Sequence, residues 1–309
     1  DGAGKATYRL HKALINQGIE SLMIVAQKHF HDDTVIRVVK DYRIMIDKNI
    51  ISKKGLFIEG YKFLLFLFHL LYWHLLLFKW RPKKLFNVNH SFISLNTLKK
   101  YLNDVDIICL YSVQSFLSAK NIKEIYQYTK APIVWTPMDI EPLTGGCHFN
   151  NGCENFSIAC GECPQLKDGH PNDISNRILK QKKKLFKDIP ITLVSCSTWV
   201  EDKIKKSSLF SNSPVKNIYL GIDQNVFKKM NKEIVRDILG LPIGKKIILF
   251  GCFNLNDERK GSKYLLNALN ILYGMLKMDQ NVINSILLIT IGREKGFDVS
   301  SLPFKHCHL

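Results

Sequence analysis

The chain has 309 residues, enough for two domains of ordinary size. Hydrophobic residues make up 46% of it, with only 10 prolines and 18 glycines, a composition that excludes a disordered or fibrous protein. The net charge of +17 favours an anionic partner, either nucleic acid, an anionic membrane face or a phosphorylated substrate, although a solvated lysine-rich surface explains the charge equally well. The eight cysteines are expected in a reducing compartment, where thiols bind metal or remain unpaired.

The chain opens with an amphipathic pattern. Residues 6–17 have apolar side chains at helical spacing and end at Gly18, and residues 19–26 then predict a strand. Residues 63–78 form the most apolar run, but a helix of this length would span only about 24 Å of a hydrocarbon core of about 30 Å. We therefore expect either a buried core helix or an interfacial helix, with the Trp, Lys and Arg residues at 73–84 at headgroup level.

The middle of the chain repeats a strand–helix–strand order. Strands are predicted over residues 105–110, 132–136, 191–195 and 215–219, and helices over 113–129, 174–187 and 198–206, the last capped by Ser197. Repeated units of this length predict an α/β fold with a parallel, doubly wound sheet. The basic residues of the second helix predict either a patch that contacts anionic lipid or a solvated helix face: Arg177, Lys180, Lys182, Lys183, Lys184 and Lys187.

The pattern restarts after a polar stretch, which predicts two Rossmann-like domains. We assign residues 1–225 to the first domain, 226–244 to a linker with a short helix over 233–239, and 245–309 to the start of the second domain. Strands are predicted there over 246–251 and 285–292, with a helix over 260–276. Because residue 1 is Asp and the chain stops soon after a strand, we expect an internal fragment with an incomplete second domain.

A cysteine-rich insert, residues 144–166, interrupts the first domain. Four thiols fall within it, at Cys147, Cys153, Cys160 and Cys163. The last two have the Cys-x-x-Cys spacing that lets one turn present two sulfurs to one ion, which predicts a closed structural zinc site with His148 as a substitute ligand. A pair of disulfides is the alternative. The remaining cysteines near apolar strands are expected to be small core residues: Cys109, Cys196 and Cys252.

Several stretches together resemble family 4 of the retaining glycosyltransferases, whose fold is GT-B. They are residues 2–10 (GAGKATYRL), 132–139 (PIVWTPMD), 142–148 (PLTGGCH), 195–199 (SCSTW), 221–223 (GID) with Phe227, and 258–261 (ERKG). The stretch 142–148 is similar to a subgroup that carries this cysteine insert. The chain departs from the family pattern at Met138, where a His is usual, at Leu220, where an Asn is usual, and at Cys252, where an Arg is common.

The resemblance implies a nucleotide-sugar donor, either UDP- or GDP-linked, and no catalytic divalent metal. It assigns Arg259 and Lys260 to the donor phosphates, where cationic groups stabilise the departing diphosphate. Gly2 and Gly4 would let backbone amides approach a phosphate or an acceptor oxygen. Asp139 follows a strand at the carboxyl edge of the sheet and would be catalytic by orienting an acceptor hydroxyl, or would cap a turn.

The implied function is sugar transfer to a lipid-linked or polysaccharide acceptor in bacterial cell-surface polysaccharide or lipopolysaccharide assembly. We expect a cytoplasmic protein that is peripheral on the inner face of the membrane, with an anionic membrane surface as partner and no nucleic acid. The alternative is a basic zinc-knuckle protein that binds nucleic acid, which charge and Cys-x-x-Cys spacing favour. The aromatic side chains interleaved with basic ones that a stacking platform needs are missing from the sequence.

Overall fold

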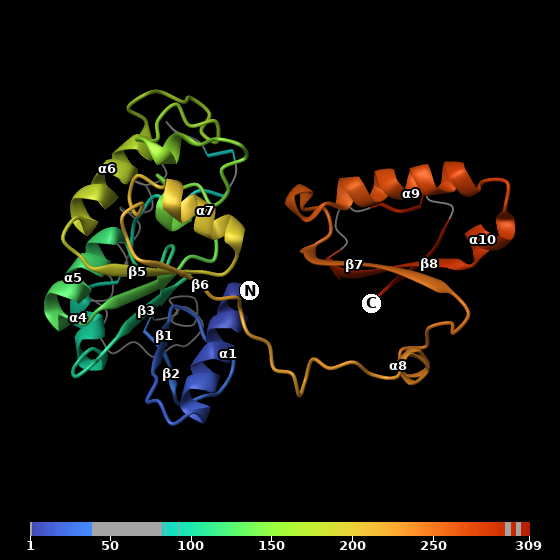
Figure 1. The fold of residues 1–309 in the computed structure, drawn as a ribbon, viewed down its shortest axis with the longest axis horizontal. Coiled ribbons are helices and arrows are strands. Elements are labelled where there is room, and N and C mark those ends of the chain that lie inside the picture. Colours follow the sequence, from blue (N-terminus) through green and yellow to red (C-terminus); the bar gives the residue numbers. More distant parts are fainter. Residues whose placement is uncertain (1, 39–81, 84, 92, 294–297, 301–303) are drawn as a thin grey trace, which may run out of the picture. The chain divides into compact units, whose positions relative to one another are not determined.

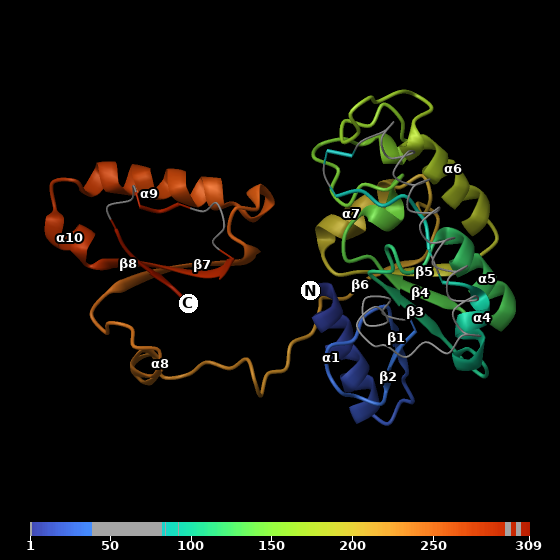
Figure 2. The same ribbon diagram turned by 180° about the vertical axis from the view of Figure 1, so that it is seen from behind.

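The computed structural model describes residues 2–38, 82–83, 85–91, 93–293, 298–300 and 304–309. The chain divides into two compact units, Asp1–Asp223 and Gln224–Leu309 (Figures 1 and 2). The apolar run at 63–78, for which a core or interfacial helix is predicted, lies outside the described residues. Among the helices that are described, none combines the length and apolar character needed to cross a membrane.

The first unit begins with helix α1 (Gly2–Asn16), followed by the parallel strands β1 (Met23–Val25) and β2 (Val35–Arg37). A buried histidine ties the helix to this pair, because the two ring nitrogens of His11 lie 2.8 Å from the hydroxyls of Ser21 and Thr34. The helix begins four residues before the predicted start at residue 6. The glycines of the expected loop are therefore helical.

The main sheet of the first unit has four parallel strands in chain order: β3 (Ile108–Tyr111), β4 (Ile133–Thr136), β5 (Ile191–Ser195) and β6 (Val215–Asn217). Parallel strands that are buried on both faces carry near-continuous apolar sequences, and β4 and β5 follow this rule. The described strand pairs of this sheet do not include the reversal of strand order that a doubly wound sheet needs.

The helices between these strands begin where a side chain caps them. Helix α5 (Ala119–Thr129) starts at a reciprocal capping box of Ser118 and Asn121, six residues after the predicted start at 113. Asp173 caps α6 (Ile174–Phe186), and Ser197 caps α7 (Thr198–Lys206) as predicted. The short helices α4 (Leu95–Leu98) and η1 (Lys99–Tyr101) precede β3.

The core of the first unit lies between the sheet and these helices. Trp135 of β4, Phe186 at the end of α6 and Phe210 form an aromatic cluster with ring centroids 5.8–6.1 Å apart. Aromatic pairs in this range add to the free energy gained from burial. One expected core residue lies elsewhere: Cys109 is exposed, so its prediction as a core side chain is wrong, because alternate positions of β3 face solvent.

The second unit contains a three-stranded parallel sheet in the order β7 (Lys246–Asn254), β8 (Ile286–Arg293), β9 (Lys305–His308). Between β7 and β8 lie η4 (Glu258–Lys260), α9 (Ser262–Leu276) and α10 (Gln280–Asn284), and α8 (Lys232–Ile238) precedes the sheet. Helix α9 lies along one face of the sheet (Figures 1 and 2), and a small apolar core around Leu269 and Leu288 separates them.

The prediction of an α/β protein with parallel sheets is confirmed. The sheets of two, four and three strands are compatible with Rossmann-like domains.

Candidate functional site

The carboxyl end of β4 carries the first candidate, Asp139. Its Oδ2 lies 2.7 Å from Nδ1 of His148, and its Oδ1 accepts a hydrogen bond of 2.8 Å from the backbone N–H of Glu141. Gln114, which follows β3, donates to the same Oδ1 over 3.5 Å. The carboxyl ends of neighbouring parallel strands thus meet around Asp139, at the edge where α/β folds bind their ligands.

His148 is the residue that sequence reasoning placed differently. Instead of replacing a zinc ligand, its side chain pairs with Asp139 and is only 10% exposed. A carboxylate beside Nδ1 accepts a hydrogen bond from that nitrogen, which leaves Nε2 as the ring nitrogen for another group. Nothing in the sequence spacing signals this pair, because the eight intervening residues form the irregular turn that brings the two side chains together.

A buried ion pair fixes the chain between Asp139 and His148. The ammonium of Lys182 on α6 lies 2.7 Å from Oε1 of Glu141, and both side chains are 3% exposed. Lys182 also donates to the carbonyls of Glu141 and Thr144, and Asn87 donates to the same Oε1. The prediction that Lys182 belongs to a surface basic patch is therefore wrong. Its ammonium is buried inside the unit, where it donates hydrogen bonds to three protein oxygens instead of to water.

The glycines at the start of the insert allow close backbone contacts. A Cβ on Gly145 would lie 2.0 Å from the carbonyl oxygen of Ser175 on α6, and one on Gly146 would lie 2.2 Å from that of Asn87. Gly146 also has a φ of 125°, which L side chains rarely adopt. The two glycines are thus required by packing of the insert against α6 and residues 86–87.

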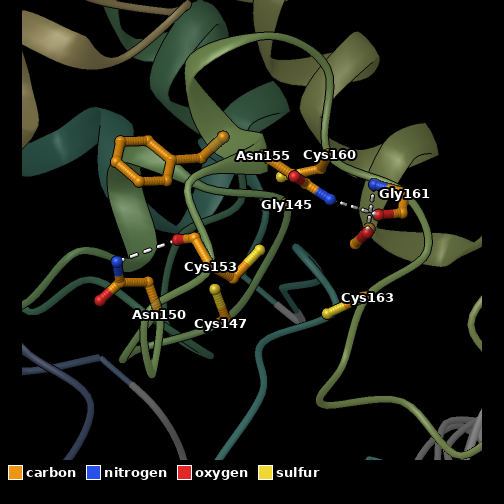
Figure 3. A pocket seen from close by; sticks show the side chains of 10 residues that line it. Gly145, Cys147, Asn150, Cys153, Asn155, Cys160, Gly161 and Cys163 are labelled. Carbon is orange, nitrogen blue, oxygen red and sulfur yellow. Dashed lines mark hydrogen bonds between the residues drawn. The ribbon is translucent and has the colours of Figure 1, made fainter.

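The four cysteines of the insert line one pocket (Figure 3). Its walls are formed by Cys147, Cys153, Cys160, Cys163, Gly145, Gly161, Asn150, Asn155, Phe156 and Ser175. All four thiols are unpaired rather than joined in disulfides. Across the part of the chain that the structure describes, no group of three or more His, Cys, Asp or Glu side chains is already arranged to hold a metal ion. The zinc assignment therefore stays a prediction.

The thiols of this pocket influence one another. Burial raises the pKa of Cys147 to about 12, and the other three thiols contribute in the same direction. Burial likewise raises the pKa of Cys160 to about 11, with contributions from Cys163 and Cys153 and an opposing one from Lys182. The sulfurs are therefore close enough to repel one another when ionised.

The second candidate lies in the second unit, where η4 joins β7 to α9. Arg259 forms a forked contact with Asp257, with Nη2–Oδ2 at 2.6 Å and Nε–Oδ1 at 3.1 Å. Hydrogen bonding to Arg259 lowers the pKa of Asp257 below its usual range. Lys260 ends η4, and Gly261 follows with a φ of 85°. The loop presents two adjacent cations at the start of a helix, which suits an anion, although one of them is already held by a carboxylate.

The remaining predicted residues, Gly2 and Gly4, lie in the first turn of α1 instead of a preceding loop. Their assignment to a phosphate or an acceptor oxygen stays a prediction. The structure brings Asp139 and His148 together and gathers the four cysteines around a separate pocket.

Comparison with known proteins gives one informative result. No family model matches the sequence. A segment of 96 residues, 29% of this chain, is 31% identical to the "putative colanic acid biosynthesis glycosyl transferase WcaC" of Escherichia coli (strain K12). The match supports a glycosyltransferase relationship. It covers 23% of the length of that protein.

Proposed function

We propose that the chain belongs to a retaining glycosyltransferase of the GT-B type, a hexosyltransferase that uses a nucleotide sugar. The similarity to a putative colanic acid glycosyl transferase carries this proposal. The parallel sheets of the two units are compatible with it, since Rossmann-like domains bind nucleotides at the carboxyl ends of their strands. The sequence motifs that resemble family 4 point to the same function.

On the acceptor side, we assign the Asp139–His148 pair to the acceptor hydroxyl. Asp139 orients the ring by accepting a hydrogen bond from Nδ1 over 2.7 Å, and an unprotonated Nε2 can then accept a hydrogen bond from a hydroxyl group. The low exposure of His148, 10%, favours a defined ring orientation over a freely rotating one. Asp139 in this arrangement acts through His148.

On the donor side, we assign Arg259 and Lys260 to the diphosphate. During transfer the bond between the sugar C1 and the diphosphate oxygen breaks, and its electron pair goes to the diphosphate. The acceptor oxygen bonds to C1 and its proton leaves to a base. Cationic side chains stabilise the negative charge that develops, so no catalytic divalent metal is needed at this position. The amides of Gly2 and Gly4 in the first turn of α1 are a further assignment for an anionic group.

The acceptor is proposed to be lipid-linked or a growing polysaccharide, used in cell-surface polysaccharide synthesis at the inner face of the membrane. The surplus of 44 basic over 27 acidic side chains suits an anionic membrane surface. Nucleic acid is not proposed as a partner, and a salt-titrated binding assay distinguishes this alternative because phosphate contacts give a steep salt dependence.

A donor screen tests the proposal. The complete protein is incubated with UDP- and GDP-sugars and an acceptor-containing membrane extract. Two quantities are measured: the release of nucleoside diphosphate and the anomeric configuration of the product. We expect acceptor-dependent release with one donor class and retention of configuration. His148→Gln should lower turnover by about 100-fold, in the range of a lost general acid–base contact. Inversion, or no release with any donor, would contradict the proposal.

A further inference from the structure

We propose that Cys147, Cys153, Cys160 and Cys163 bind one zinc ion in a closed, structural site. This inference is independent of the glycosyltransferase assignment. All four residues belong to the insert and line the same pocket (Figure 3). Four thiolates with no position left for water are the ligand set of structural zinc sites.

The four cysteines line one pocket, and none of them is joined in a disulfide (Figure 3). Four reduced cysteines around one pocket supply the ligand set that a divalent cation can bridge.

The backbone at each cysteine is held by hydrogen bonds. The carbonyl of Cys147 accepts from the Thr144 hydroxyl over 2.8 Å, and that of Cys153 accepts from the Asn150 amide over 2.9 Å. The carbonyl of Cys160 accepts from the amide of Asn176, and the N–H of Cys163 donates to the carboxylate of Asp173 over 2.9 Å. The scaffold therefore fixes where each Cα lies before any ligand binds.

The Cys-x-x-Cys turn holds an uncommon conformation. Cys160, Gly161 and Glu162 are consecutive residues with φ values of 51°, 106° and 47°. A non-glycine residue in this region costs roughly 1 kcal/mol or more, and such residues gather at ligand-binding sites. Gly161 cannot be replaced without collision, because a Cβ there would lie 2.4 Å from the carbonyl oxygen of Pro171. The turn therefore directs two sulfurs toward one pocket at the expense of backbone strain.

The sulfurs are not yet at ligand positions. Each can turn about its Cα–Cβ bond between staggered positions while its backbone stays in place, so metal binding requires side-chain rotation rather than refolding of the insert. A zinc ion at this place would also hold Cys147, and thereby the adjacent His148, in position.

Metal analysis of the 309-residue chain tests the site. The protein is purified with zinc present and dialysed, and its zinc content is measured by mass spectrometry. Apo protein is then titrated with Co²⁺, whose visible absorption reports tetrahedral thiolate coordination without the need for a variant. We expect one zinc per chain and a cobalt–thiolate spectrum that saturates at one equivalent.

Two serine variants distinguish the insert from the other thiols. Cys153→Ser should weaken metal affinity at least about 10-fold, in the range seen when a metal site loses a supporting group. Cys109→Ser, an exposed cysteine outside the insert, should bind zinc as the parent does. Absence of bound zinc with all thiols reactive toward a thiol reagent would overturn the proposal. So would the loss of four reactive thiols without reductant, which indicates two disulfides.

Discussion

The insert (residues 144–166) and the η4 loop (residues 255–261) are the two regions where we place chemistry, and they are held in different ways. The insert is fixed by partners outside it, such as Lys182 for the carbonyl of Thr144 and Asp173 for the N–H of Cys163, and these contacts are buried. The η4 loop is fixed by its own neighbours, since Arg259 binds Asp257 two residues before it and remains 39% exposed.

The two regions should therefore tolerate substitutions differently. Buried contacts between distant segments contribute strongly to the free energy of unfolding, because removal of one partner leaves the other desolvated. Exposed local ion pairs contribute little to stability and remain available to a ligand. We therefore expect substitutions in the insert to affect folding, and substitutions in the η4 loop to affect donor binding with little change in stability.

The largest effect is expected at the buried ion pair. Lys182→Met leaves the Glu141 carboxylate buried without its cation and should lower the free energy of unfolding by about 3–5 kcal/mol. Denaturant unfolding of the variant measures this loss. Lys180→Met on the exposed side of the same helix is the matched control and should change stability by less than about 0.5 kcal/mol. Equal losses in both variants would remove the distinction between buried and exposed lysines.

A smaller loss is expected where the insert packs against α6. Gly145→Ala places a Cβ 2.0 Å from a backbone carbonyl oxygen, which cannot turn aside as a side chain can. The resulting displacement should cost about 1–3 kcal/mol. Gly274→Ala in α9, where a Cβ meets nothing within 4 Å, should instead stabilise the second unit by about 0.5–1 kcal/mol. Thermal unfolding of both variants checks the pair, and an unchanged Gly145→Ala protein would refute the close contact.

The smallest stability effect is expected in the η4 loop. Arg259 lowers the pKa of Asp257, so this carboxylate adds stability above its unfolded pKa and loses it as the pH falls through its folded pKa. Because the pair is partly exposed, the contribution should be below about 1 kcal/mol. An NMR titration of Asp257 should show a pKa below the usual value, and Arg259→Ala should raise it. An unshifted titration would mean that the forked contact does not persist in solution.

Much of the fold follows from local sequence. The strand over 191–195 and the helix over 198–206 are found at the predicted residues, because apolar alternation and a Ser197 cap are local signals. The start of α5 was missed because the capping box at Ser118, rather than the apolar pattern from Val113, sets the first helical residue.

The candidate site was less predictable than the fold. The position of Asp139 at the end of a strand follows from the α/β pattern, but its partner His148 depends on the path of an irregular turn. The burial of Lys182 likewise depends on a carboxylate 41 residues earlier in the chain. Such long-range pairs leave no periodic pattern in a single sequence. The sequence of a lysine-rich helix therefore does not reveal whether one of its lysines is buried.

The role assigned to the η4 loop can be measured most directly through the departing diphosphate. Nucleoside diphosphate release by the complete protein is compared for the parent, for Arg259→Ala with Lys260→Ala, and for Lys277→Ala, an exposed lysine just after α9. We expect release to fall about 100-fold or more in the double variant, since each lost electrostatic contact raises the barrier by roughly 2.7–4 kcal/mol. Lys277→Ala should release nucleoside diphosphate at nearly the parent rate. Unchanged release by the double variant would contradict the proposed diphosphate site.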